Sequence, residues 1–101
     1  MLPPFDLGPL PGEWQEVHGT DDAADLEREL DRELSPGHVL AGVKARAIAT
    51  RTHLKDVIFW LPEESKWAWI HLTYNVETDP RWPSAFTADT WDDLVDELVS
   101  D

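Results

Sequence analysis

Two residues with acid–base chemistry, Asp56 and His71, fall on neighbouring predicted strands of this 101-residue chain. The segments 56–61 and 66–74 alternate as strands, and the four-residue loop 62–65 joins them. If that loop sets the register, Asp56 lies directly opposite His71. A carboxylate beside an imidazole is a common general-base arrangement. Because no serine or other nucleophile is placed beside the pair, a structural ion pair is the favoured interpretation.

No other pattern in the sequence dictates a reaction. The chain has no cysteine, which excludes disulfides, thiolate metal sites and a cysteine nucleophile. Its four histidines are not spaced like helical metal ligands, and no phosphate-binding glycine loop or nucleophile motif occurs. We therefore expect no catalytic residue, no metal site and no cofactor. An enzyme or small-ligand binder that uses Asp56 and His71 is kept as a minor alternative.

Carboxylates are concentrated at the two ends of the chain. The net charge of −13 divides into −8 over residues 1–39, +2 over residues 40–75 and −7 over residues 76–101. Such a distribution repels nucleic acid and anionic lipid and attracts basic surfaces. We therefore expect a basic protein partner, with neither nucleic acid nor a membrane involved.

Both acidic ends are predicted to be helical. Thr20 is expected to cap a helix over 21–34, and Thr90 a helix over 91–99, each with an apolar stripe at helical spacing. Carboxylates recur four residues apart on both helices, and each such pair costs roughly 0.2–0.5 kcal/mol. Helix stability therefore does not explain the acidity. Two interpretations remain, namely a docking surface for a basic partner and a solvated face kept acidic for solubility or salt adaptation. The preferred acidic contacts are Asp92, Asp93, Asp96 and Glu97.

The remaining strand patterns predict an α+β domain with a three- to four-stranded antiparallel sheet, flanked by an N-terminal and a C-terminal helix. Residues 43–51 alternate as a first strand, with Ala47 and Ala49 on one face and Ile48 on the other. Residues 85–87 are expected to add a short edge strand. The segment 13–18 is ambiguous between a strand and a helical turn. An extended proline-rich arm over 1–12 is expected to precede a single domain over 13–101.

Both faces of the predicted hairpin are apolar, which raises the question of what covers the second one. The predicted register places Trp60 opposite Trp67 and Ile58 opposite Trp69 on one face. This tryptophan face is either core, a homodimer interface or a contact for a different protein. Trp82, in a proline-bounded loop, is a further candidate for an exposed anchor. The candidate partner-binding tryptophans are therefore Trp67, Trp69 and Trp82.

Several segments give the chain the layout of a known class of small acidic proteins. These are ARAIATR, DVIFWL, WIHLTYN and the final W-x-x-L-V helix, which together span roughly residues 20–100. In layout and charge the chain resembles small bacterial immunity proteins, which bind and neutralise a cognate toxin. The resemblance implies a basic partner such as a toxin, and identifies no functional residue.

The leading hypothesis is an immunity or antitoxin-like protein that inhibits a basic partner by steric occlusion. The alternative is a self-associating structural or accessory protein that forms a homodimer through the tryptophan face. The N-terminus lacks a basic segment followed by a long apolar run, so we expect a cytoplasmic protein.

Overall fold

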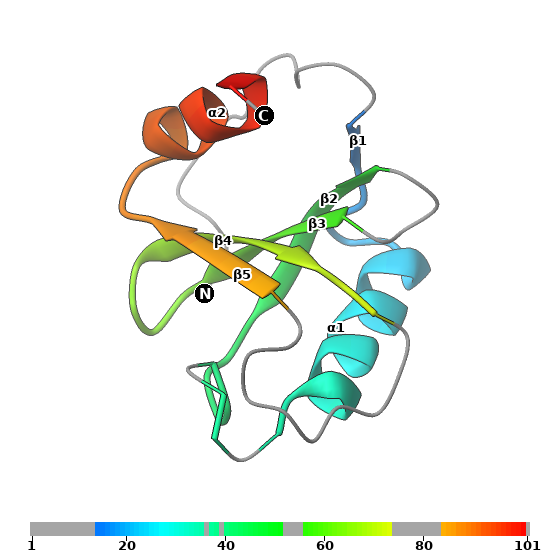
Figure 1. Ribbon diagram of the computed structural model, residues 1–101. Helices are drawn as coiled ribbons and strands as arrows, with labels where there is room; N and C mark the ends of the chain where they lie inside the picture. The colour runs from blue at the N-terminus through cyan, green and yellow to red at the C-terminus, as the bar shows by residue number, and fades with distance from the viewer. Residues whose placement is uncertain (1–13, 36, 39, 52–55, 74–83, 101) are drawn as a thin grey trace.

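The computed structural model describes residues 14–35, 37–38, 40–51, 56–73 and 84–100. The elements follow one another as β1 (Gln15–Glu16), α1 (Asp21–Glu33), β2 (Arg46–Arg51), β3 (Asp56–Leu61), β4 (Lys66–His71), β5 (Ser84–Ala88) and α2 (Trp91–Ser100) (Figure 1). The five strands form one sheet in chain order, and every neighbouring pair is antiparallel. The α+β class is confirmed, whereas the predicted count of three to four strands is too low. The predicted arm over 1–12 lies outside the described residues.

The additional strand is β1, from the segment that the sequence left ambiguous. Gln15 pairs with Thr50 and Glu16 with Ala49 at the edge of β2. The backbone N–H groups of Val17 and His18 then both donate to the Ile48 carbonyl, at 2.8 and 3.2 Å. This short contact brings the chain to the sheet edge immediately before α1 begins.

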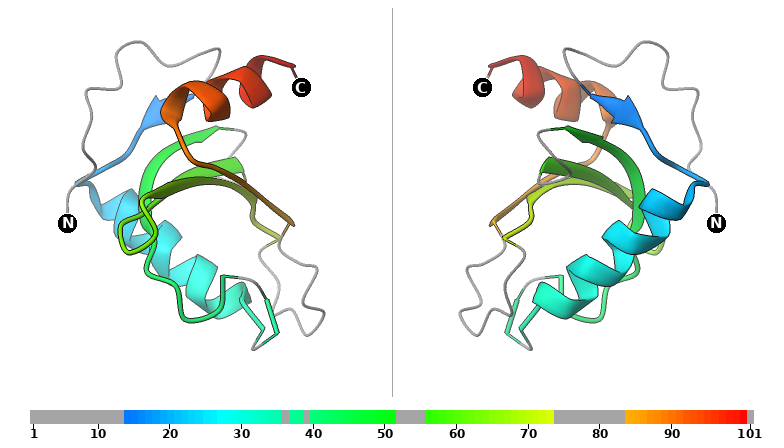
Figure 2. Two further views of the ribbon diagram at one scale, coloured as in Figure 1. Left: turned by 90° about the vertical axis from the view of Figure 1, so that its left-hand side faces the viewer. Right: turned by 90° about the vertical axis from the view of Figure 1, so that its right-hand side faces the viewer.

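The two helices cover opposite faces of the curved sheet (Figure 2). Leu26 and Leu30 of α1 belong to the same buried cluster as Phe59. Leu94 and Leu98 of α2 belong to a second cluster, which contains the tryptophan face of the hairpin. The sheet is therefore the middle of three layers, and each apolar face of the hairpin has a helix of its own chain against it.

Local sequence signals set both helix starts. The Thr20 side chain accepts a hydrogen bond from the Ala23 N–H at 3.3 Å, and the Thr90 side chain accepts one from the Asp93 N–H at 3.1 Å. Both threonines thus act as the predicted N-caps, because their side-chain oxygens satisfy N–H groups that the helix leaves unpaired. At Leu34, which follows α1, the backbone returns to an extended conformation.

The hairpin of β3 and β4 has the predicted register. Asp56 pairs with His71, Ile58 with Trp69 and Trp60 with Trp67. The turn between the strands places Ser65 at a φ of 52°, in the left-handed region, and the Glu64 N–H donates to the Leu61 carbonyl at 3.1 Å. The register therefore follows from the turn length and the alternation of side chains.

The predicted alternation of β2 is wrong, because the strand contains an irregularity. Ala47 pairs with Phe59 and Ala49 with Ile58, so one residue of β2 is inserted between them. Ala47 belongs to the cluster under α1, while Ile48 and Ala49 both belong to the cluster under α2. The extra residue interrupts the two-residue period, as a β-bulge does, and Ala49 and Ile48 consequently share a face.

Candidate protein-binding site

The outer side of α2 carries a continuous group of carboxylates. Leu94 is completely buried and Leu98 nearly so, which fixes the side of the helix that meets the sheet. All four predicted acidic contacts are exposed on the solvent side. We call this group the α2 acidic face, and it consists of Asp92, Asp93, Asp96 and Glu97. Helical periodicity produces this separation of apolar and charged residues.

Only some of the charges of the α2 acidic face stabilise the helix itself. Asp92 and Asp93 lie in the first turn, where the helix dipole favours negative charge. Asp96 and Glu97 lie further along, four residues from those aspartates, and α2 has no basic residue in its last turn. Like charges at this spacing repel each other. The acidity of α2 therefore requires another reason, such as solubility or a partner.

The acidic residues of α1 have a different environment, because arginines lie beside them. Arg28 forms an ion pair with Asp25. Arg32 contacts Glu29 through two nitrogens, with Nε–Oε1 at 3.0 Å and Nη2–Oε2 at 2.6 Å. Partial burial acts to raise the pKa of Glu29, but the Arg32 contacts and a hydrogen bond with Glu33 outweigh it. The pKa of Glu29 is therefore lowered from its ordinary value of 4.5.

Two further carboxylates of α1 hold the fold together. The buried Glu33 side chain accepts hydrogen bonds from the Thr73 N–H at 2.7 Å and from the Thr73 hydroxyl at 3.0 Å. Glu27 accepts one from the Ala47 N–H at 2.9 Å. Much of the acidity of α1 is thus engaged within the protein. The four carboxylates of the α2 acidic face are all exposed, which makes α2 the stronger candidate for contact with a partner.

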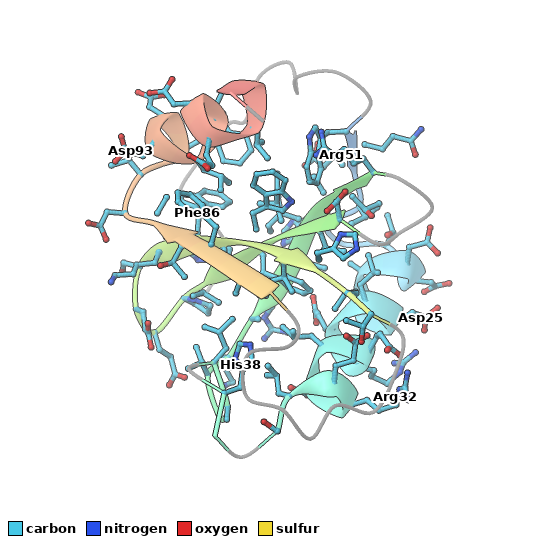
Figure 3. All side chains as sticks on the ribbon, viewed as in Figure 1. Asp25, Arg32, His38, Arg51, Phe86 and Asp93 are labelled. Atoms are coloured by element: carbon cyan, nitrogen blue, oxygen red, sulfur yellow. The ribbon has the colours of Figure 1, made fainter. Side chains whose placement is uncertain are left out.

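An exposed aromatic side chain lies near the start of α2. Phe86 on β5 is 38% exposed, and it is the one large hydrophobic residue that is exposed in the described part of the chain. It pairs with Trp69 on β4. Figure 3 shows Phe86 and Asp93 on the same side of the molecule, where β5 leads into α2. Phe86 is not among the residues that the sequence singled out, although an aromatic residue on a predicted edge strand was an available signal.

The structure places the three predicted tryptophans in different environments. Trp67 is only 3% exposed, and its ring lies 4.8 Å from those of Trp60 and Trp91, measured between centroids. Trp69 is partly buried, and Trp82 lies outside the described residues. Trp67 therefore belongs to the core beneath α2. At Trp67 the tryptophan face is covered by α2, so it does not offer the open surface that the predicted homodimer would use. Self-association itself stays a prediction.

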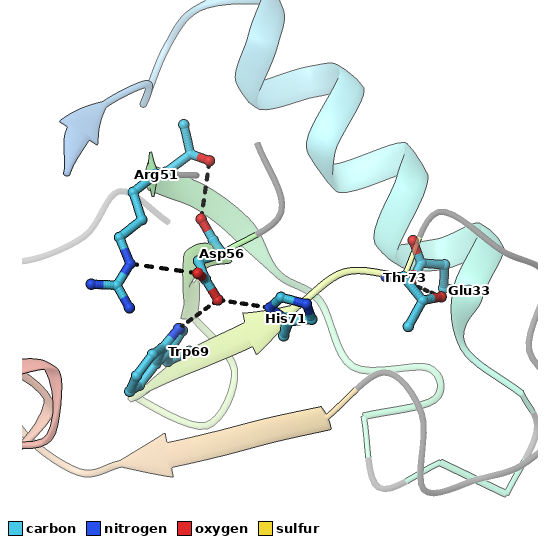
Figure 4. A network of polar contacts seen from close by, with 7 residues as sticks. Glu33, Arg51, Asp56, Trp69, His71 and Thr73 are labelled. Carbon is cyan, nitrogen blue, oxygen red and sulfur yellow. Dashed lines mark hydrogen bonds and ion pairs between the residues drawn. The ribbon is translucent and has the colours of Figure 1, made fainter. Parts of the chain in front are cut away.

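The predicted Asp56–His71 pair is present and belongs to a larger polar network (Figure 4). Asp56 Oδ1 lies 2.9 Å from His71 Nδ1 and 3.4 Å from Trp69 Nε1, which donates to it. Arg51 Nε lies 3.5 Å from the other oxygen, Oδ2. The Arg51 guanidinium also lies over the Trp14 and Trp69 rings, at 4.8 and 5.5 Å. A nearly buried carboxylate with three such neighbours is well suited to hold strand ends together.

The Thr50 hydroxyl, beside this network, is already engaged. Thr50 Oγ1 is buried and donates to the Asp56 backbone carbonyl at 3.0 Å. Asp56 on β3, with Arg51 on β2 and His71 on β4, therefore connects three strands at one end of the sheet. This geometry favours the structural interpretation of the pair.

Two open hollows lie beside α1, and Glu27 and Arg46 line both of them. One has a volume of about 440 Å³ and extends to His18 and Thr20, and the other, of about 320 Å³, extends to Asp31 and Lys44. Their lining mixes both signs of charge. Within the described ranges, no three histidine or carboxylate side chains come together in a way that could hold a metal ion. Neither of the helices described has the length and apolar character needed to cross a bilayer.

Comparisons with protein-family models, with curated proteins and with solved structures find no match to this chain.

Proposed function

We propose that this protein binds a basic protein partner through α2 and blocks it sterically, in the manner of an immunity or antitoxin-like inhibitor. The observation that carries the proposal is the α2 acidic face, in which four exposed carboxylates share a helix that has no basic residue. The net charge of −13 supports it, because it attracts a basic surface from a distance.

The geometry supports a rigid recognition element. Leu94 and Leu98 attach α2 to the sheet, so its carboxylates are held in place before a partner arrives. Preorganised charges steer the encounter and select a partner of opposite charge. Phe86, at the edge of the same region, supplies an apolar contact that can be desolvated on binding. Together they provide a charged rim beside an aromatic anchor.

The proposal is tested by capture of basic proteins from the host lysate on the tagged, full-length protein. We expect a specific basic protein to be retained at low salt and released at high salt, because screening weakens contacts between exposed charges. Retention that is equally strong at high salt contradicts the proposed mechanism.

Two variants with equal charge separate recognition from solubility. The first neutralises the α2 acidic face by Asp92→Asn, Asp93→Asn, Asp96→Asn and Glu97→Gln. The second neutralises four exposed α1 residues by Asp21→Asn, Asp22→Asn, Asp25→Asn and Asp31→Asn. Each variant changes four carboxylates, which takes the net charge from −13 to −9. We expect only the α2 variant to lose the partner, and equal losses would assign the binding to the net charge of the protein rather than to α2.

A further inference from the structure

The two edges of the sheet differ in how they are protected. At the β2 edge, β1 pairs with Ala49 and Thr50, and the Glu27 carboxylate accepts the Ala47 N–H. At the opposite edge, β5 forms hydrogen bonds to β4 alone within the part of the chain that the structure describes. A strand at an edge leaves every second N–H and C=O pair directed outward.

The β5 strand lacks the usual features that prevent pairing with another chain. Its sequence, SAFTA, contains no charged residue and no proline. Its pairing with β4 is continuous over five residue pairs, with no bulge that would twist the edge away. Phe86 and Thr87 are both exposed and lie on opposite faces of the strand. This edge is therefore chemically suited to accept a further strand.

We propose that β5 is the docking edge for an extended segment of the basic partner, which adds to the sheet as an additional strand. This inference rests on the proposed function and specifies how the partner is bound. The contact would consist of backbone hydrogen bonds to β5, an apolar side chain on Phe86 and basic side chains directed toward α2.

The position of α2 determines the chemistry of the docked segment. The helix packs against both β4 and β5 and lies over the face of the sheet that carries Phe86 (Figure 2). Side chains of a strand alternate between the two faces of the sheet. On the face that carries Phe86, an apolar residue flanked two positions away by lysine or arginine complements Phe86 and the carboxylates of α2 together.

The same geometry disfavours a second copy of this chain at the β5 edge. Antiparallel pairing of two β5 strands requires a two-fold axis perpendicular to the sheet, which keeps both α2 helices on the same face. Two α2 acidic faces, each with four carboxylates, would then lie on the same side of the joined sheet. Like-charge juxtaposition of this kind costs free energy, whereas a basic strand removes the cost.

The test uses the full-length ¹⁵N-labelled protein and the peptide acetyl-Thr-Lys-Thr-Val-Thr-Lys-Thr-amide as a probe. Two matched peptides carry three backbone N-methyl groups each, one at the last three Thr positions and the other at the Lys, Val and Lys positions. Their charge is unchanged, and only one set of N–H groups can face β5 in a docked strand. Affinity is measured by titration at low salt, and amide exchange is followed across β5.

We expect one methylated peptide to bind about tenfold more weakly or worse, and the other to bind like the unmethylated peptide. Alternate amides of β5 should gain protection from exchange in the complex. Equal binding of all three peptides overturns strand addition but leaves the salt-dependent function of α2 intact. Absence of binding by the unmethylated peptide also overturns it, as does β5 protection in the free protein that rises with protein concentration.

Discussion

The Glu27 carboxylate accepts a hydrogen bond from the backbone N–H of Ala47, at 2.9 Å and across twenty residues of sequence. Arg46 Nη1 lies 3.7 Å from the other oxygen of the same carboxylate. A side chain of α1 thereby occupies a backbone donor of β2, next to the irregularity in that strand. In the sequence, Glu27 is one of many carboxylates on an acidic helix, and only the fold distinguishes it from its neighbours.

Glu27→Ala is expected to lower the free energy of unfolding by about 1–2 kcal/mol, because it leaves the Ala47 N–H without this acceptor. Glu27→Gln keeps an acceptor oxygen in place and should cost less. Urea unfolding of both variants measures the difference. Equal losses in the two variants would show that the charge, rather than the hydrogen bond, carries the effect.

Glu33→Ala is expected to cost about 2–3 kcal/mol, since the Thr73 N–H and hydroxyl both lose a buried carboxylate partner. Thermal or urea unfolding provides the measurement. The matched control is Asp31→Ala on the exposed side of the same helix, which should change stability by no more than about 0.5 kcal/mol. A similar cost at both positions would contradict the stabilising role of the Glu33–Thr73 hydrogen bonds, which connect α1 to the residues after β4.

The Glu29–Arg32 pair predicts a defined pH dependence of stability. The folded protein lowers the pKa of Glu29 below 4.5, so the folded state binds its proton less readily than the unfolded state does. The stabilisation is complete above the ordinary pKa of 4.5, which the unfolded state keeps. It is lost as the pH falls below 4.5 through the lower pKa of the folded state. Glu29→Gln should therefore be less stable than the wild type at neutral pH.

This stability difference should shrink in acid, and urea unfolding between about pH 7 and pH 3 measures it. A difference that stays constant over this range would contradict the assignment. Because the pair lies at the helix surface, we expect the effect to be small.

Phe86→Ser tests the proposed aromatic anchor. We expect the affinity for the captured basic partner to fall about tenfold, while the unfolding free energy changes by less than about 1 kcal/mol, because the side chain is partly exposed. Thr87→Ser, on the opposite face of β5, is the control and should leave binding unchanged. Binding that survives Phe86→Ser unaltered would remove this residue from the site.

His71→Gln separates the structural from the catalytic interpretation of the Asp56 network. The His71 side chain is about half exposed, so its removal should cost less than about 1 kcal/mol and leave partner binding intact. Asp56→Ala should cost more, about 1–3 kcal/mol, because Trp69, His71 and Arg51 all lose the carboxylate that they share. Abolition of an enzymatic activity by His71→Gln in a folded protein would revive the catalytic alternative.

The sequence was most informative where local rules set the structure. The caps at Thr20 and Thr90 depend on residues three positions away, and the register of the hairpin depends on one short turn. Both are decided by nearby chain geometry, so alternation and spacing predicted them. The acidic side of α2 was predictable for the same reason, because helical periodicity separates Leu94 and Leu98 from the carboxylates.

Features that depend on distant contacts were not predictable. The irregularity of β2 lies among small residues that fit either face, so nothing in the segment ARAIATR marks the inserted position. The burial of Glu33 depends on Thr73, forty residues away. The exposure of Phe86 depends on the position of α2 over the sheet, and one sequence pattern cannot show which part of a face a helix leaves uncovered.

The three indoles in series, Trp60, Trp67 and Trp91, give the protein an intrinsic optical reporter. Their rings are 4.8 Å apart in each successive pair and are tilted by 56° and 58°. Electronic transitions of indoles this close couple, and the coupling produces a circular-dichroism signal that depends on their mutual orientation. Because Trp91 is the first residue of α2, displacement of that helix would change this signal even if the strands remained paired. Helix undocking can therefore be followed spectroscopically without a label.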